Sequence, residues 1–161
     1  MASISGNNRI IIKGKYTEGG VEKEEGRLKA AGYPGMNVVS TADPDEMGRQ
    51  VYTPGSTEYA GTGTNVTTVK APLWLLTEDV YQGKTVDDVY AADENCFVHL
   101  CSPGEIVQVL VKSGQTVVKG EGLTADSTGK FITDNTNAAL LALEGSNGAL
   151  AADTLMRARV L

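Results

Sequence analysis

Closely spaced turn signals constrain this chain more than any other feature. From residue 71 onward, clusters of Gly, Pro, Asn, Asp and Ser interrupt the apolar runs roughly every eight to twelve residues, which is typical of a β-sandwich or a small barrel. The chain has 19 glycines among 161 residues, and aromatic residues make up 6% of it. Val and Thr are abundant, and this mixture favours strands joined by turns over helices. We therefore predict a mainly β protein, a small β-barrel or sandwich with little helix.

Three segments give the clearest strand patterns. Asn95–Leu100 is a short apolar stretch that stops at a Ser-Pro-Gly turn, and Glu105–Val111 is apolar on both faces, which predicts burial on both sides. Thr154–Leu161 alternates, with small or apolar residues on one face and Arg157 and Arg159 on the other. All three are expected to be strands. Ala138–Glu144 is too short for its periodicity to distinguish helix from strand.

The first part of the chain has a different character. We predict an extended, loop-rich N-terminal arm over residues 1–70 and a β-rich core domain over 71–161. Val21–Ala31 fits a short helix, although Gly26 in its middle disfavours it by about 1 kcal/mol relative to Ala. Ser40–Thr68 is dense in Gly, Thr, Asp and Pro and cannot fill a core alone. It is either a loop system or an arm that becomes ordered on a partner.

Charge and hydropathy exclude several classes of protein. Fourteen basic residues stand against twenty acidic ones, a formal charge of −6, whereas nucleic-acid binding depends on clustered Lys and Arg. We therefore expect no direct nucleic-acid contact. The longest apolar runs are far too short to span a bilayer, so no membrane contact is expected. The N-terminus lacks the pattern of a signal peptide, and two cysteines in such a chain are expected to be free thiols.

The single histidine, His99, lies between Cys96 and Cys101. A zinc site needs three or four converging ligands. On a regular strand His99 and Cys101 share a face and Cys96 points to the other, and the chain has no further Cys or His to complete a site. A Cys/His nucleophile pair would need favourable rotamers and a device to stabilise an oxyanion. We expect ordinary strand positions, with no metal and no catalytic residue.

Two acidic pairs and one glycine-rich segment also suggest chemistry at first sight. Asp87-Asp88 and Asp93-Glu94 lack the alternating ligands of a calcium loop, so solvated turn residues are expected. Gly61–Asn65 lacks the Gly-Lys-Ser/Thr ending of a phosphate loop, so a flexible loop is expected. Neither feature predicts a bound cofactor.

The segment Glu105–Leu123 resembles the hairpin of biotinyl and lipoyl carrier domains, in which glycines make the turns and residues such as Val117 point inward. Those domains carry a modifiable Lys at an exposed tip, flanked by Met or Ala. Here the next tip, Asp126–Lys130, has no such flank. We expect a shared structural hairpin without the carrier chemistry. A carrier domain modified at Lys119 or Lys130 remains the alternative.

A resemblance of wider extent begins at Leu73–Tyr90. This stretch resembles the hydrophobic–Glu-Asp–x–x–Gln-Gly-Lys–x–x–Asp-Asp–x–Tyr stretch of tailed-bacteriophage head decoration proteins, also called capsid cement proteins. The resemblance covers roughly residues 27–161. It departs from the family at Asp93–Asn95, where the family has Gly-Asp after the Tyr. Further segments follow the order of that family: Tyr33–Met36, Ser102–Glu105, Ser113–Gln115, Gly120–Asp126, Gly129–Lys130 and Met156–Leu161.

The resemblance implies a β-tulip-like domain that forms a homotrimer and does no catalysis. It implies a protein made in the host cytoplasm that binds the outer surface of the assembled head in the virion and bridges neighbouring major capsid proteins. Arg suits such contacts, since its guanidinium pairs well with carboxylates at interfaces. Candidate subunit or capsid contacts are Tyr52, Tyr59, Arg49, Arg157 and Arg159.

A carbohydrate-binding β-sandwich is a third interpretation. It needs exposed aromatic rings, and the chain offers one Trp and six Tyr. Trp74 lies in an apolar run, where we expect it to be buried. This interpretation therefore ranks below the other two.

Overall fold

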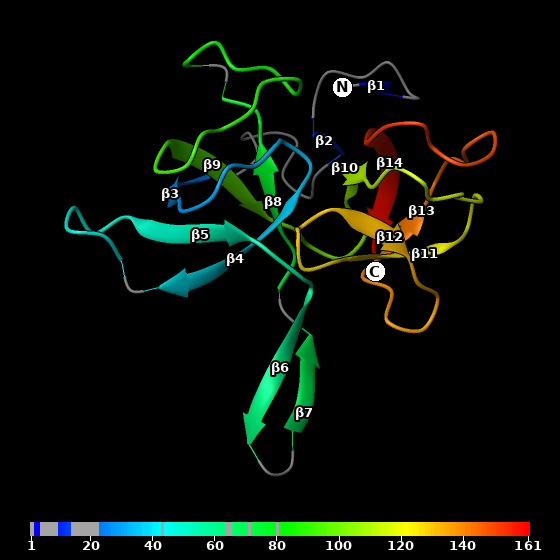
Figure 1. Ribbon diagram of the computed structural model, residues 1–161, viewed down its shortest axis with the longest axis horizontal. Coiled ribbons are helices and arrows are strands. Elements are labelled where there is room, and N and C mark those ends of the chain that lie inside the picture. The colour runs from blue at the N-terminus through cyan, green and yellow to red at the C-terminus, as the bar shows by residue number, and fades with distance from the viewer. Residues whose placement is uncertain are drawn as a thin grey trace.

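The computed structural model describes residues 2–3, 10–13, 23–42, 44–63, 66–70, 72–79 and 81–161 (Figure 1). For 2–3, 11–13, 41–42, 58–63 and 66–70 it describes the backbone alone. Strands are the only regular elements in these residues, and no helix occurs among them. The predicted mainly β fold is confirmed, and it is built from a closed barrel, a larger sheet and a separate hairpin.

The barrel closes from five strands that come from both halves of the chain. β3 pairs in parallel with β5 and antiparallel with β9, while β4 joins β5 to β8 and β8 returns to β9. Closure leaves none of these strands with a free edge along its whole length. The strands are β3 (Glu24–Leu28), β4 (Asn37–Ala42), β5 (Gln50–Pro54), β8 (Trp74–Thr77) and β9 (Asn95–Leu100).

The larger sheet has seven strands in the order β1-β14-β13-β11-β12-β10-β2. An additional antiparallel pairing of β10 with β14 runs over six residue pairs and brings the two sides of this sheet together. The strands are β1 (Ala2–Ser3), β2 (Ile11–Lys13), β10 (Ile106–Val111), β11 (Gly122–Ala125), β12 (Phe131–Thr133), β13 (Leu140–Ala142) and β14 (Thr154–Val160).

A third, two-stranded sheet consists of β6 (Glu58–Gly63) and β7 (Val66–Lys70). The two strands pair antiparallel, with an irregularity in register between Ala60 and Gly63. In Figure 1 this hairpin lies apart from the barrel and from the seven-stranded sheet. Gly61–Asn65, expected to be a loop, therefore overlaps the end of β6, and residues 64 and 65 lie outside the described part.

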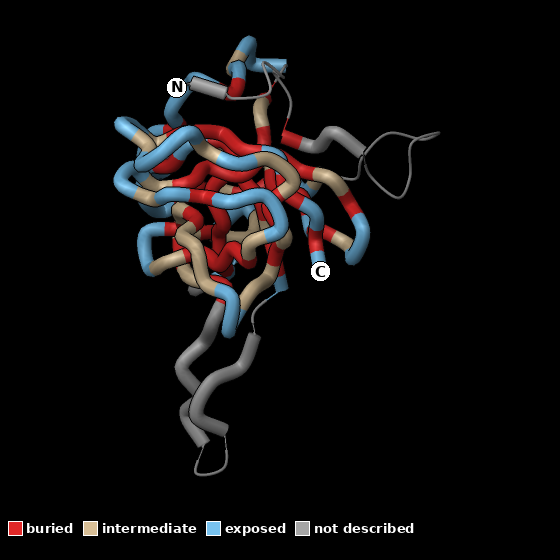
Figure 2. The backbone as a smooth tube through the Cα atoms, turned by 90° about the vertical axis from the view of Figure 1, so that its right-hand side faces the viewer, coloured by how far each residue is buried: buried red, intermediate tan, exposed pale blue. Residues whose placement is uncertain are grey.

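Each of the two large β structures has its own core. In Figure 2 the buried stretches lie inside the molecule and the exposed ones mostly around them. The barrel encloses Leu28, Val38, Tyr52, Leu76, Tyr90, Cys96 and Val98, with Trp74 packed against them. The second core is larger and includes the apolar residues of β10, β11 and β14 together with Phe131 and Leu140. All of β10 except its first residue is buried, as its two-sided apolar pattern predicts.

Buried hydrogen bonds join the barrel to the seven-stranded sheet. The amide of Asn37 donates to the carbonyl of Gly129 at 2.8 Å. The hydroxyls of Thr57 and Thr124 lie 2.7 Å apart, and both residues are buried. Gly129 has a φ of +80°, and a Cβ there would lie 2.4 Å from the carbonyl oxygen of Asn37, so this close approach requires glycine.

Two sequence predictions about the first part of the chain are wrong. Val21–Ala31 does not form a helix over its described residues, because Glu24–Leu28 pairs with two barrel strands instead. Residues 1–70 are not simply an arm, because β3, β4 and β5 close the barrel with strands from beyond residue 71. In both cases the strands form by pairing with segments distant in the chain, and local composition does not predict such pairing.

The same correction applies to part of Ser40–Thr68. Its first portion belongs to β4 and β5 of the barrel, and its last portion belongs to the separate hairpin. The strand predictions for Asn95–Leu100 and Thr154–Leu161 are confirmed by β9 and β14, and Ala138–Glu144 contains the short strand β13.

Candidate functional site

Three chemically reactive side chains meet where the barrel passes into the seven-stranded sheet. His99 is in β9, and Cys101 follows the end of that strand. The turn Ser102–Gly104 comes next, with Gly104 at a φ of +91°. Glu105 directly precedes β10. This tight turn brings the carboxyl group of Glu105 back over the end of β9.

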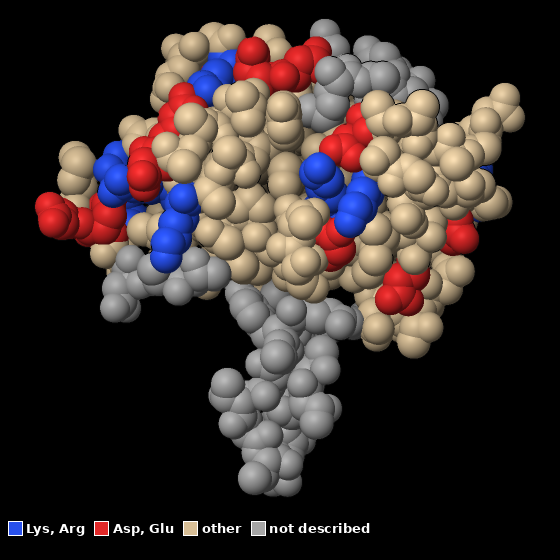
Figure 3. Space-filling view, in the orientation of Figure 1, with Lys and Arg blue, Asp and Glu red and all other residues tan. Residues whose placement is uncertain are grey.

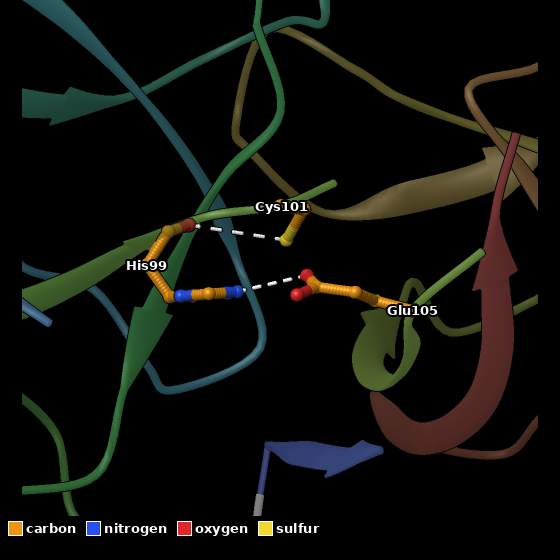
Figure 4. A group of neighbouring side chains, drawn as sticks. All are labelled: His99, Cys101 and Glu105. Carbon is orange, nitrogen blue, oxygen red and sulfur yellow. Dashed lines mark hydrogen bonds and ion pairs between the residues drawn. The ribbon is translucent and has the colours of Figure 1, made fainter. Parts of the chain in front are cut away.

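The donor atoms of these three residues converge (Figure 4). His99 Nε2 lies 2.8 Å from Glu105 Oε2, and the backbone N–H of Ser102 donates to the same oxygen at 3.0 Å. The Cys101 thiol lies 3.8 Å from the carbonyl oxygen of His99. One donor atom from each side chain lies within 4.8 Å of the other two. The three groups therefore form one polar cluster at the junction.

All three side chains of the cluster are buried. His99 is 6% exposed, Cys101 9% and Glu105 4%. Burial, and then the negative charge of Glu105, raises the pKa of the Cys101 thiol well above its ordinary value. The thiol contact is to a backbone carbonyl, and the imidazole contact is to a carboxylate. The raised pKa of the Cys101 thiol is opposite in direction to the lowered thiol pKa of an activated cysteine nucleophile.

Sequence reasoning placed His99 and Cys101 on one strand face but missed Glu105. A signal for it existed, because an acidic residue stands at the start of a strand that is otherwise apolar on both faces. A buried carboxylate needs a hydrogen-bonding or charged partner. The partner could not be identified without the geometry of the Ser102–Gly104 turn.

The two acidic pairs belong to turns, as expected. Asp88 accepts hydrogen bonds from the backbone and the hydroxyl of Thr85, at 2.7 and 2.8 Å. Glu94 forms an ion pair with Lys84 at 2.7 Å, and Asp93, at a φ of +66°, forms one with Arg27 at 2.9 Å. The Asp88 bonds lie within one turn, whereas the two ion pairs connect the turn before β9 to Lys84 and to Arg27 of β3.

Of the candidate contact residues, two are exposed on β14. Arg157 and Arg159 point outward while Ala158 between them is buried, so the predicted alternation is confirmed. The guanidinium of Arg157 contacts Glu144 at 3.2 Å. On the face drawn in Figure 3, basic and acidic side chains lie in mixed groups separated by wide uncharged areas.

The other three candidates differ in accessibility. Arg49 forms an ion pair with Asp45 at 2.8 Å and hydrogen-bonds Asn95, so it connects its own loop to the start of β9. Tyr52 must be corrected: it is 1% exposed, because its ring fills the barrel core, and it is not a surface contact. Tyr59 lies in β6, and its side chain is outside the described residues.

The structure also shows the positions of the residues on which the carrier-domain and carbohydrate-binding interpretations depend. Lys119 is exposed on the turn that follows Val117. Lys130 forms an ion pair with Asp153 at 2.7 Å, and its turn packs against the barrel through Gly129. Trp74 is half-buried rather than fully buried as expected, and it packs against the barrel core with its ring centroid 5.7 Å from that of Tyr52.

Comparison with protein-family models and with curated protein sequences finds no match for this chain. Among the described residues there is no helix of the length and apolar character needed to cross a membrane.

Proposed function

We propose that this protein is a bacteriophage head decoration protein, which binds the outer surface of the assembled shell and bridges neighbouring major capsid proteins. The observation that carries the proposal is the β6–β7 hairpin, which forms a two-stranded sheet of its own. An isolated two-stranded hairpin is marginally stable in water. A hairpin that packs against the surface of another protein is consistent with a decoration protein that binds the capsid shell.

The motifs behind the family resemblance fall at positions where they shape the fold. Gly83 and Gly104 both have positive φ, at 73° and 91°, so each makes a turn that other residues would strain. Tyr90 is fully buried in the barrel core, and its hydroxyl donates to the carbonyl of Thr77 at 2.9 Å. The resembling residues thus support one common β framework.

Exposed arginines on β14 offer a second contact. Arg159 is exposed next to the buried residues Ala158 and Val160. A guanidinium on a rigid strand loses little freedom when it pairs with a carboxylate of a partner. We assign Arg159 to the contact with a capsid protein or with a second copy of this chain.

Stabilisation of the shell then follows from mass action. A ligand that binds the assembled shell and not the free subunits stabilises the assembly by RT ln(1 + [L]/Kd). Three hairpins in a trimer would raise the avidity by about 10²–10⁴ over one hairpin, provided all three reach the shell together. Size-exclusion chromatography with light scattering measures the oligomer directly, and a monomer would remove this part of the mechanism.

The test is co-sedimentation of the full chain with mature heads of the phage that encodes it, followed by heating of the decorated and bare heads. We expect saturable binding and a higher temperature of shell disruption. Replacing residues 59–69 by a short Gly-Ser linker should abolish binding while the circular dichroism spectrum of the two large sheets is retained. Heads that neither bind the chain nor gain heat resistance would refute the proposal.

A matched pair of charge reversals tests the β14 contact. Arg159→Glu and Lys29→Glu change the net charge equally, and both residues are exposed, but Lys29 follows β3 in the barrel. We expect Arg159→Glu to weaken binding to heads at least about tenfold, a change expected when like charges are brought together across an interface. Equal weakening by both variants would show a general charge effect and would exclude a specific role for Arg159.

A further inference from the structure

We propose that His99, Cys101 and Glu105 form a binding site for a divalent transition-metal ion of the zinc class. The three residues supply an imidazole nitrogen, a sulfur and a carboxylate oxygen, with the donor atoms within 4.8 Å of one another. Figure 4 shows the sulfur and the imidazole both facing the carboxylate. A site of this kind goes beyond the binding of a capsid.

The donor set selects the type of ion. Zinc binds Cys, His and Asp/Glu at about 2.0–2.3 Å, and three protein ligands with one exchangeable position form a known class of zinc site. Calcium and magnesium take oxygen ligands almost exclusively, so a site with a thiol and an imidazole disfavours them. Donor atoms this close can reach one central ion with side-chain movements of about an ångström or less.

Charge balance favours a divalent ion over a monovalent one. All three ligands are at least nine-tenths buried. A thiolate and a carboxylate together carry two negative charges, which a divalent cation neutralises. Leaving a net charge at such a depth would carry a large desolvation cost.

The protons also balance. The balance starts from a protonated Cys101 thiol and a neutral His99 imidazole that is hydrogen-bonded to the carboxylate of Glu105. When the ion binds, the thiol proton is released to solvent and the imidazole proton is carried by Nδ1. One proton leaves for each ion bound, and the fourth position of the tetrahedron takes a water molecule.

The position in the fold indicates a structural effect. His99 belongs to the barrel, and Glu105 leads into β10 of the seven-stranded sheet. The turn between them is fixed by the bond from Ser102 N to Glu105 and by the bond from Gly104 N to the carbonyl of Val160 at 2.9 Å. An ion bound here ties the end of β9 to the start of β10, and so holds the two β structures together.

The experiment is titration of the metal-free full chain with Co²⁺, read by visible absorption, with Zn²⁺ competition. We expect one ion per chain, with tetrahedral cobalt bands and a thiolate-to-cobalt charge-transfer band that Zn²⁺ abolishes. Cys96 provides the matched control, because it is also a buried cysteine but lies within β9 in the barrel core. Cys101→Ser should lose the charge-transfer band, and Cys96→Ser should keep it.

Glu105→Gln keeps an acceptor for the Ser102 amide and removes the charge, so it should still fold. Its affinity for Co²⁺ should fall more than about tenfold. For the wild-type chain, Zn²⁺ should raise the temperature of unfolding relative to the chelator-treated protein, because an ion bound to the native state stabilises that state. This readout does not depend on any variant.

Two results would overturn the assignment. One is a wild-type chain that shows no charge-transfer band and no metal-dependent rise in unfolding temperature. The other is a band that survives in Cys101→Ser or disappears in a folded Cys96→Ser. No capsid enters these measurements, so their result is separate from the test of the decoration function.

Discussion

The aromatic ring of Tyr52 occupies the space that a side chain at position 26 would need. A Cβ built on Gly26 would lie 2.6 Å from Cε2 of Tyr52 and 2.8 Å from the carbonyl oxygen of Gln50. Gly26 is in β3 and Tyr52 in β5, which pair in parallel. The glycine that disfavours a helix in this segment is therefore the residue that lets the barrel close around a large aromatic ring.

Gly26→Ala should destabilise the protein by about 1–3 kcal/mol, because overpacking a dense core forces shifts in neighbouring atoms. Urea unfolding followed by circular dichroism measures the change. Tyr52→Leu relieves part of the clash. The double variant should therefore lose less stability than the sum of the losses in the two single variants. Strict additivity, or an unaffected Gly26→Ala variant, would contradict this packing.

Asn37→Ala should cost about 1–3 kcal/mol, since it removes a buried side chain that hydrogen-bonds two backbone groups. Asn37 is fully buried, its Nδ2 donates to the carbonyl of Gly55 at 2.8 Å, and its Oδ1 accepts from the amide of Trp74 at 3.3 Å. Asn147→Ala, at an exposed position, is the control and should change the free energy of unfolding by less than about 0.5 kcal/mol. Equal effects of the two variants would contradict the role of Asn37.

Acid should weaken the protein through its turn carboxylates. Hydrogen bonds from the backbone amides of Thr136 and Asn137, at 2.8 and 3.2 Å, lower the pKa of Asp134 below its ordinary value. A group with a depressed folded pKa contributes stability that is present above its unfolded pKa of about 3.9 and is lost as the pH falls through the folded value. The stabilisation from Asp134 should thus disappear at pH values below 4.

Comparison of the wild type with Asp134→Asn in urea at a series of pH values checks this. The wild type should be the more stable protein at neutral pH, and the difference should shrink to nothing once the carboxyl is protonated. A difference that stays constant down to acid pH would show that the charge of Asp134 is not involved.

Neither cysteine should react with a thiol reagent in the native protein. Both thiols are buried, and burial raises the pKa of Cys96 to about 12, so almost no thiolate exists at pH 8. A colorimetric disulfide reagent should detect no thiol in the native metal-free chain and two in urea. Ser127→Cys places a thiol at an exposed turn position and should add one that reacts at once. Rapid native labelling of Cys96 would contradict the closed barrel.

Much of the strand pattern could be predicted because it depends on neighbours along the chain. Asn95–Leu100 and Thr154–Val160 are strands because their side chains alternate between a core and an outer face, a period that is visible in the sequence. Glu24–Leu28 could not be predicted in this way. Its partners, β5 and β9, lie far along the chain, and tertiary pairing overrode the local helical pattern.

The candidate site shows the same division. The two-residue period of a strand was enough to place His99 and Cys101 on one face. Glu105 joins them because a positive φ at Gly104 turns the chain back, and its carboxyl group then meets His99 at 2.8 Å. The sequence places His99, Cys101 and Glu105 close together along the chain. The direction of the turn at Gly104 determines that their side chains converge.

The sequence by itself determined the kind of protein this is: short strands, frequent glycine turns and a final strand with apolar and arginine faces. These properties depend on each residue's own conformational preferences and on the spacing of apolar side chains. Tertiary structure decided that strands from both sides of residue 70 close one barrel, that Tyr52 is inside it and that β6–β7 is not. These features depend on contacts between residues that are distant in the chain. Such contacts contribute to the free energy of folding only when the chain has brought the residues together.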